Sequence, residues 1–520
     1  MTTQTNCLVD FPGSLRKLAT ADALIVCATV MAIASLLVRQ YNDADTWWHL
    51  AIGRDILESC SIPSTDRFSA AGWGRSYHDS HWLFQVVLAA ADRLGGSIAV
   101  GTFPIAVWSA TFLCCYRSIR NSLPAAASCL LLFIAAIACS SRFIPRPDII
   151  SYLMIALYYL RLQTGRYSTK SDLALFGMLQ LIWSNSHGLF VIGPFMAGCY
   201  LVEAIWNTIR GKQAALKQSI WLLTVLLVAT LITPFGVDGW HYALQIAQEA
   251  GSTQAHVIFK DLEELRPIFR LNMLFNPDCV AFFLISAITA GTLSLACIYR
   301  PFSIARLCIA VALFAVASVS GRRNIPLFTL AAIPLIAESI ELLRLRILLN
   351  TRAIFAGAIL LFCFTSLPLS GHYYQWFKYD PLRFGIGAPA EYQPSGLPDF
   401  LRRINFTGQI YNNDLFGGYC LYYGILPLVD GRWEVYDPEE LTVILRAPFD
   451  QTAWAWVVNR YNVKGALVRN GEPATMALVS RFIADGSFQM VYQDKVSTFW
   501  LRLPETINSR QGSSGDEILR

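Results

Sequence analysis

The stretch Ala23–Leu37, ALIVCATVMAIASLL, contains no charged side chain, and Gln218–Thr230, QSIWLLTVLLVAT, repeats this composition. Similar apolar runs recur along much of the 520-residue chain, which is 54% hydrophobic and only 15% charged. A soluble chain usually carries about 25% charged residues. Because backbone groups in hydrocarbon must be bonded within their own segment, these runs predict helices that cross a membrane.

The apolar runs predict about eleven spans. Their approximate ranges are 21–39, 97–116, 123–141, 148–162, 172–185, 187–206, 217–235, 278–298, 303–320, 324–343 and 353–370. The runs 148–162 and 172–185 are short for about 30 Å of hydrocarbon. Every second turn between the predicted spans carries positive charge, and Arg16 and Lys17 precede the first span. By the positive-inside rule these turns face the cytoplasm, so eleven spans leave the C-terminal region on the external face. The net charge of +5 therefore reflects membrane orientation and gives no reason to expect a nucleic-acid partner.

Five regions follow from this pattern. They are a cytoplasmic N-terminus (1–20), a transmembrane domain (21–370) with external loops 40–96 and 236–277, an external soluble α/β domain (371–505) and a disordered tail (506–520). The first loop contains amphipathic stretches at Trp47–Leu57 and His81–Leu94. In the soluble domain the predicted strands are Gln409–Asn412, Leu428–Asp430, Gly465–Arg469, Phe488–Tyr492 and Ser497–Arg502, and the predicted helices are Pro438–Arg446, Ala453–Tyr461 and Pro473–Asp485. The predicted fold class is thus a polytopic α-helical membrane protein with a C-terminal soluble α/β domain.

Several external turns carry acids, imidazoles and guanidiniums toward one membrane face. Together with two indoles and one amide, the candidate residues are Asp43, Asp45, Trp47, Trp48, His49, His81, Arg142, Arg146, Asp148, Asn185, His187, Arg322 and Arg323. Ionisable groups at the edge of the hydrocarbon are costly and are usually retained for a partner. The sequence therefore predicts a functional site on the external side.

Four external arginines, Arg142, Arg146, Arg322 and Arg323, oppose the positive-inside trend. A planar guanidinium binds two phosphate oxygens at once, so the phosphate or diphosphate of a lipid in the bilayer is a suitable partner. An alternative is that these arginines pair with loop carboxylates or with lipid headgroups.

The acidic pair Asp43 and Asp45 follows the first span directly. Two carboxylates at this spacing can share a divalent cation such as Mg²⁺ or Mn²⁺, or one of them can act as a general base. Trp47 and Trp48 follow, and their rings suit the membrane interface or stacking on a sugar. The simpler interpretation is that Asp45 caps a helix beginning at Thr46.

His187 and Asn185 lie where one predicted span ends and the next begins. Their side chains can bind substrate hydroxyls or phosphate, and they can equally bond the exposed carbonyls of a helix end. His49, His81 and Asp148 are further candidates for binding the substrate.

Several motifs resemble one superfamily. They are the acidic pair followed by W-H-L-x-x-G-x-x-I (Trp48–Ile56), Ser61–Ser69 (SIPSTDRFS), His81-Trp82-Leu83, Trp183–Gly188, Thr233–Gly236 and Arg322–Phe328, with a weaker match at Asp430-Gly431-Arg432 and Tyr436. Over residues 20–345 the chain resembles GT-C glycosyltransferases, and more closely a group of poorly characterised bacterial membrane proteins assigned to that superfamily.

The resemblance implies a multi-span fold in a bacterial cytoplasmic membrane, with the C-terminal domain in the periplasm. It implies transfer of a hexose or pentose from a polyprenyl-phosphate-linked donor to a lipid, glycan or protein acceptor. Asp43 or Asp45 would then be the base or metal ligand, and the four external arginines would hold the donor phosphate. No motif identifies the sugar, the acceptor or which aspartate acts.

Two functions of other classes also fit a multi-span chain. A transporter or flippase for a lipid or polysaccharide would place charges along the spans, but here most charges lie at the membrane faces. A non-catalytic component of an envelope-polysaccharide assembly would use the soluble domain for docking. Loss of activity on replacing Asp43 and Asp45 would argue against both.

Overall fold

A computed structural model describes residues 12–165, 167, 169–212, 215–250, 268–269, 274–299, 303–343, 350–376 and 383–504. The predicted tail 506–520, residues 1–11 of the predicted N-terminus and much of the predicted loop 236–277 lie outside these ranges. The chain forms two compact units. Met1–Ser64 with His78–Pro389 is the helical unit, and Thr65–Tyr77 with Ala390–Arg520 is the C-terminal unit.

Helices occupy all eleven predicted spans. They are α1 (Pro12–Leu37), α3 (Trp82–Ile119), α4 (Ala125–Cys139), α5 (Asp148–Leu162), α6 (Lys170–Ser184), α7 (Ile192–Ile209), α8 (Leu216–Leu231), α11 (Pro277–Tyr299), α12 (Ile304–Ser320), α13 (Ile325–Leu342) and α14 (Thr351–Leu369). Shorter helices α9 (Asp238–Ala250) and α15 (His372–Trp376) follow α8 and α14.

Not all of these helices are long enough to cross a membrane alone. Within the described ranges, seven helical stretches have the required length and composition: Thr20–Leu37, Trp82–Ile119, Ala125–Arg142, Gly188–Ile209, Pro277–Ala296, Arg322–Leu342 and Thr351–Leu369. α8 and α12 are apolar but shorter. α5 and α6 have 15 residues each, or about 22 Å of helix. The prediction of a multi-pass helical membrane protein is confirmed, whereas the count of eleven spans stays a prediction.

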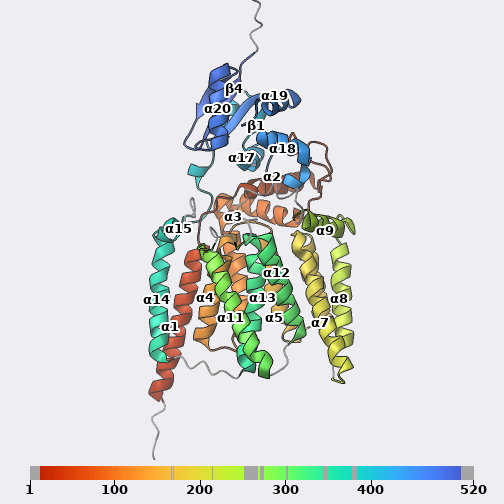
Figure 1. The fold of residues 1–520 in the computed structure, drawn as a ribbon, viewed down its shortest axis with the longest axis vertical. Helices are drawn as coiled ribbons and strands as arrows, with labels where there is room; N and C mark the ends of the chain where they lie inside the picture. The colour runs from red at the N-terminus through yellow and green to blue at the C-terminus, as the bar shows by residue number, and fades with distance from the viewer. Residues whose placement is uncertain are drawn as a thin grey trace, which may run out of the picture. The chain divides into compact units, whose positions relative to one another are not determined.

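The long helices of the helical unit run side by side (Figure 1). α1 packs along α14, both α11 and α12 pack against α13, and α7 packs against α8. α13 lies at the centre, since every residue from Ile325 to Ala337 is buried. Its apolar residues surround the whole helix, as expected for a helix enclosed by others.

The two amphipathic stretches predicted in the first loop are helical. One is α2 (Ala44–Ser59), and the other is the first part of α3, which bends sharply at Gly95 and Gly96. Gly96 has a φ of +56°, which a residue with a Cβ adopts only with strain. α2 packs on α3 so closely that a Cβ on Gly53 would lie 2.1 Å from the carbonyl oxygen of Gln85. Both helices cross the ends of the upright helices and cover that end of the bundle (Figure 1).

The C-terminal unit contains a four-stranded sheet in the order β1-β2-β4-β3. β1 (Gln409–Asn412) is parallel to β2 (Val463–Arg469), while β4 (Ser497–Arg502) is antiparallel to both β2 and β3 (Phe488–Gln493). Its helices are α16 (Leu397–Arg403), α17 (Asp414–Tyr422), α18 (Pro438–Arg446), α19 (Gln451–Arg460) and α20 (Pro473–Asp485). The predicted soluble α/β domain is therefore confirmed.

The C-terminal unit is discontinuous, unlike the predicted domain 371–505. It consists of Thr65–Tyr77, which was predicted to lie inside the external loop 40–96, and of Ala390–Arg520.

The predicted strand Leu428–Asp430 is wrong for a related reason. The carbonyl oxygen of Leu428 accepts a hydrogen bond from Ala71 N at 3.0 Å, and Leu428 N donates to the side chain of Asn412 at 2.7 Å. Because these partners satisfy the backbone groups, the segment joins no sheet.

Candidate active site

Asp43 and Asp45 lie at the start of α2. Asp43 has an extended backbone (φ −124°, ψ 120°), and its Oδ2 accepts hydrogen bonds from Thr46 N at 3.0 Å and Thr46 Oγ1 at 2.8 Å. Asp43 is therefore the residue that caps the helix. The capping interpretation named Asp45, which instead lies in the first turn because the helix begins at Ala44 rather than Thr46.

Arg146, in the turn before α5, holds both carboxylates. Its Nε and Nη2 lie 2.8 and 2.5 Å from Asp43 Oδ1, and Nη2 lies 3.0 Å from Asp45 Oδ2. The Asp43 side chain is 6% exposed, whereas that of Asp45 is 24% exposed. Asp43 is thus a buried anchor for Arg146, and Asp45 presents the more accessible carboxylate.

This arrangement does not fit the divalent cation considered for Asp43 and Asp45. The guanidinium of Arg146 stands within hydrogen-bond distance of both carboxylates and already supplies the positive charge that a shared Mg²⁺ or Mn²⁺ would bring. Within the described residues, no group of three or more His, Cys, Asp or Glu side chains is arranged to hold a metal ion. We therefore derive no step through a metal.

Two further external arginines also pair with acids. Arg142 forms an ion pair with Asp148, the first residue of α5, and both side chains are nearly buried. Arg322 Nε lies 2.5 Å from Oδ2 of Asp278, which is fully buried. For Arg142, Arg146 and Arg322, the structure supports the alternative in which external arginines pair with carboxylates. Removing one partner of such a pair leaves an uncompensated charge, so loss of either partner would destabilise this end of the bundle.

Arg323 differs from the other three arginines. Its side chain is half-buried, and among the described residues it has neither a hydrogen bond nor an ion pair. Its carbonyl oxygen is held by the hydroxyl of Tyr152 at 2.9 Å, and that hydroxyl also lies 3.3 Å from Asp148 Oδ2. Burial first, and then the charges of His81 and Arg323, lower the pKa of His187. Arg323 therefore places a guanidinium, without an ion-pair partner among the described residues, near the start of α5.

Three imidazoles form a row in the site. The ring of His81 lies 5.6 Å from those of His49 and His187, centroid to centroid. Burial lowers the pKa of His81 to about 4, and burial followed by the charge of His81 holds the pKa of His187 well below its ordinary value. Both rings are therefore neutral at pH 7. His187 Nδ1 lies 2.8 Å from Ser151 Oγ, which accepts a hydrogen bond from Trp183 Nε1.

Other predicted site residues have structural partners. Asn185 Oδ1 accepts from Trp82 Nε1 at 2.9 Å, and Asn185 Nδ2 donates to the carbonyl oxygens of Leu181 and Ile232. This side chain ties α3 to the ends of α6 and α8. Trp47 and Trp48 are both buried, which argues against the predicted stacking on a sugar. Instead, Trp48 Nε1 donates to Asp45 Oδ1 at 3.2 Å.

Sequence reasoning missed Ser151, Tyr152 and Asp278 as members of this region. Ser151 and Tyr152 lie three and four residues after Asp148, so they project from the same face of α5. That spacing was available in the sequence. Asp278 had only the weaker signal of an acid at the external end of an apolar run.

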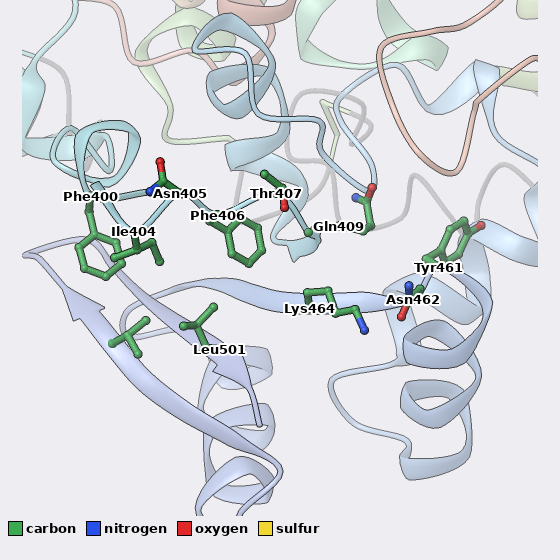
Figure 2. Close-up of a pocket in the computed structure, with 12 residues that line it drawn as sticks. Phe400, Ile404, Asn405, Phe406, Thr407, Gln409, Tyr461, Asn462, Lys464 and Leu501 are labelled. Atoms are coloured by element: carbon green, nitrogen blue, oxygen red, sulfur yellow. The ribbon is translucent and has the colours of Figure 1, made fainter. Parts of the chain in front are cut away.

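A separate hollow of about 570 Å³ opens on the C-terminal unit (Figure 2). It lies beside β2 and the turns after α16 and α19, and Lys464 is the one charged residue in its lining. Its lining contains neither a carboxylate nor an imidazole, the groups that most often act as a general base. The candidate active site therefore lies in the helical unit, where Arg146, in the turn before α5, binds Asp45 and the carbonyl oxygen of Arg323 is bonded to Tyr152 of that helix.

Comparison with solved structures tests this architecture. The archaeal oligosaccharyltransferase AglB from Archaeoglobus fulgidus, in complex with an inhibitory peptide and a dolichol-phosphate, has a TM-score of 0.54 at 12% identity, over 94% of this chain and 75% of that chain. The apo oligosaccharyltransferase of Archaeoglobus fulgidus has a TM-score of 0.56 at 11% identity, with the same coverage. ArnT from Cupriavidus metallidurans, bound to undecaprenyl phosphate, has a TM-score of 0.52 at 14% identity, over 93% of this chain and 98% of that chain.

The chain has the GT-C fold. No protein-family model and no curated protein matches the sequence, so the likeness lies in the arrangement of the chain. The matches cover the C-terminal unit as well as residues 20–345. The GT-C fold therefore extends further than the sequence motifs.

Proposed function

We propose that this protein is a glycosyltransferase that moves a sugar from a polyprenyl-phosphate-linked donor to an acceptor on the periplasmic side of a bacterial cytoplasmic membrane. The observation that carries the proposal is the arrangement at the covered end of the bundle. There Arg146 orients the accessible carboxylate of Asp45. The guanidinium of Arg323, which has no ion-pair partner among the described residues, acts electrostatically on His187. The GT-C fold adds support, since AglB and ArnT with this fold bind dolichol-phosphate and undecaprenyl phosphate.

In the proposed reaction, a nucleophilic atom of the acceptor attacks the anomeric carbon of the donor sugar. The bond from that carbon to the phosphate oxygen breaks, and the polyprenyl phosphate leaves with the bonding electrons. Asp45 accepts the proton of the nucleophile. Arg323 stabilises the negative charge on the departing phosphate, because a charge-assisted hydrogen bond strengthens as that charge develops.

We assign the base to Asp45 and a positioning role to Asp43. A base must reach the proton that it removes, and the Asp45 carboxylate is the more exposed of the two. Asp43 caps α2 and holds Arg146, which fixes the orientation of Asp45. A site held by packed neighbours keeps reacting groups within the narrow range of productive geometries.

The structure gives the transporter alternative little support. Glu203 and Glu338 lie within the predicted spans 187–206 and 324–343, and both have partners near the start of α12. Glu203 Oε2 accepts from Ser303 Oγ at 2.6 Å and from Ala305 N at 2.8 Å, and Glu338 pairs with Arg306 at 2.9 Å. Both acids therefore serve to connect neighbouring helices.

Lipid extracts test the proposed function directly. Deletion of the gene should cause a polyprenyl-phosphate-linked sugar to accumulate, and one envelope glycan or glycoprotein should lose that sugar. Mass spectrometry of lipids and glycans from the two strains measures both changes. Identical profiles in both fractions would count against sugar transfer from a lipid donor.

The periplasmic placement of the C-terminal unit has its own test. In a cysteine-free background, a cysteine at the exposed position Ser395 should react with a membrane-impermeant thiol reagent in intact spheroplasts. A cysteine at exposed Asn121, in the turn after α3, should react only after the membrane is permeabilised. The opposite labelling pattern would place the C-terminal unit in the cytoplasm.

A further inference from the structure

The hollow on the C-terminal unit has the size of a ligand site, and its whole lining belongs to that unit (Figure 2). Its volume of about 570 Å³ is inside the range of about 300–1,000 Å³ that is usual for small-molecule sites. The turn after α16 and the turn after α19 form part of the lining, together with one residue from each of the four strands. The hollow and the candidate active site therefore share no residue.

Both turns contain an asparagine in the left-handed backbone conformation. Asn405 and Asn462 each have a φ of +49°, and Cys60 is the one other non-glycine residue with a positive φ in the part of the chain that the structure describes. Each asparagine follows the C-cap of a helix, Ile404 for α16 and Tyr461 for α19, at a position that glycine usually occupies. Glycine would adopt this backbone with less strain, so both positions keep a side-chain amide that the helix end does not require.

The polar side chains of the two turns and of β2 are available to a ligand. Four exposed residues of the lining form no side-chain hydrogen bond or ion pair within the described ranges: Asn405, Thr407, Asn462 and Lys464. A side-chain amide donates and accepts hydrogen bonds, and a hydroxyl does both as well. The hollow therefore presents donors and acceptors together with the positive charge of Lys464.

The aromatic part of the lining is held in place by packing. Phe406 meets Phe499 edge to face, with 5.4 Å between the ring centres, and a Cβ added to Gly465 would lie 3.2 Å from Phe406 and still closer to Phe499. The hydroxyl of Tyr461 donates to Glu440 Oε1 at 2.6 Å. Because these side chains are already fixed, they lose little freedom when a ligand binds, which favours affinity.

This combination matches the chemistry of a sugar that carries one acidic group. Sugar hydroxyls both donate and accept, so they suit amides better than groups that only donate or only accept. The C–H face of a sugar ring is apolar and can contact Phe406, Tyr461 and Leu501. Lys464 supplies a point charge with no acid beside it in the lining, so a single carboxylate is a suitable partner. The lining therefore favours a uronic acid over a neutral sugar.

We propose that the hollow binds an oligosaccharide that contains a uronic acid. The amides of Asn405 and Asn462 bond its hydroxyls, and Lys464 pairs with its carboxylate. This binding does not depend on the reaction assigned to Asp45. The further role of the bound oligosaccharide as the sugar acceptor rests on the proposed function, and it identifies the acceptor as an acidic glycan.

Isothermal titration calorimetry on the full-length protein in lipid nanodiscs tests the binding without a donor. The probes are tetrasaccharides of galacturonate, glucuronate and mannuronate, the neutral methyl ester of each, and hexaglutamate as an acidic peptide. Asn405→Gly and Asn462→Gly remove an amide at a φ that glycine adopts readily, and Lys464→Gln removes the charge. The control is Lys495→Gln, which removes an exposed lysine of the same unit outside the lining.

At least one uronate tetrasaccharide should bind, and its methyl ester should bind about tenfold more weakly. Lys464→Gln should reduce the affinity for the acid to that for the ester, whereas Asn405→Gly and Asn462→Gly should lower both affinities about three- to tenfold. Lys495→Gln should bind as the natural protein does. The proposal is overturned if no uronate binds at millimolar concentration, if all variants bind equally, or if hexaglutamate binds more tightly than every sugar.

A transfer assay with an acidic glycan as acceptor separates this inference from the proposed function. Asn405→Gly and Asn462→Gly should raise the KM for the acceptor about three- to tenfold and leave kcat unchanged. A protein that binds the uronate tetrasaccharide but transfers no sugar would refute the proposed function and leave the binding site intact. Normal transfer with an unchanged acceptor KM in both variants would refute the acceptor role of the hollow.

Discussion

Replacement of Asp45 with Asn is expected to lower the turnover of sugar transfer about 10²- to 10⁴-fold, the usual contribution of a general base. Asparagine has the same shape as aspartate, but its amide does not accept the proton of the acceptor nucleophile. The melting temperature should stay close to that of the natural protein, because the Asp45 side chain is partly exposed and Arg146 keeps its two bonds to Asp43. Single-turnover kinetics together with thermal unfolding measure both quantities.

The same substitution elsewhere on α2 provides the control. Asp55→Asn, which is half-buried on that helix, should leave turnover within about twofold. Asp43→Asn should lower turnover and also stability by roughly 1–3 kcal/mol, since it weakens the helix cap and the partner of Arg146. If Asp45→Asn retains normal turnover and only Asp43→Asn loses it, the base has been assigned to the wrong aspartate.

Replacement of Arg323 with Lys should reduce turnover or donor affinity about ten- to a hundredfold, since a charge-assisted contact contributes roughly 1.5–3 kcal/mol. Lysine keeps the positive charge but loses the planar group that bonds two phosphate oxygens. The melting temperature without ligand should not change, because Arg323 has no ion pair among the described residues. Undecaprenyl phosphate should raise the melting temperature of the variant less than that of the natural protein.

Arg322→Lys serves as the comparison, since Arg322 is adjacent in sequence but is paired with the buried Asp278. This change should lower the melting temperature without ligand, because lysine does not reproduce the guanidinium geometry, and donor-induced stabilisation should remain. If Arg323→Lys shows that pattern and Arg322→Lys does not, Arg323 is the structural residue and the donor phosphate binds elsewhere.

The parts of the fold that depend on local composition could be predicted from the sequence. The apolar runs alone indicated where the long helices lie, because a bilayer leaves few other conformations for such segments. The predicted span from residue 97 also matches the bend in α3, since Gly95 and Gly96 interrupt the helix there. The helices Pro438–Arg446 and Pro473–Asp485 were predicted to the residue, each with proline at its first position.

The contacts between distant parts of the chain could not be predicted in this way. Asp66 and Arg432 belong to motifs that were both noted in the sequence, but the 366 positions between them give no sign that they meet. Leu428–Asp430 looks like a strand locally and is not one, because an inserted segment and a side chain take its backbone bonds. Similarly, the roles of the four external arginines depend on which acids reach them, and only the structure separates Arg323 from the rest.

The most direct test of the central claim compares envelope lipids and glycans from strains that carry the natural gene, the Asp45→Asn allele or the Asp55→Asn allele at equal protein levels. We predict that Asp45→Asn accumulates the polyprenyl-phosphate-linked sugar and lacks the corresponding glycan modification, as the deletion strain does. Asp55→Asn should resemble the natural strain. Normal lipids and glycans in the Asp45→Asn strain would contradict the assignment of this chain as a glycosyltransferase that uses Asp45 as its base.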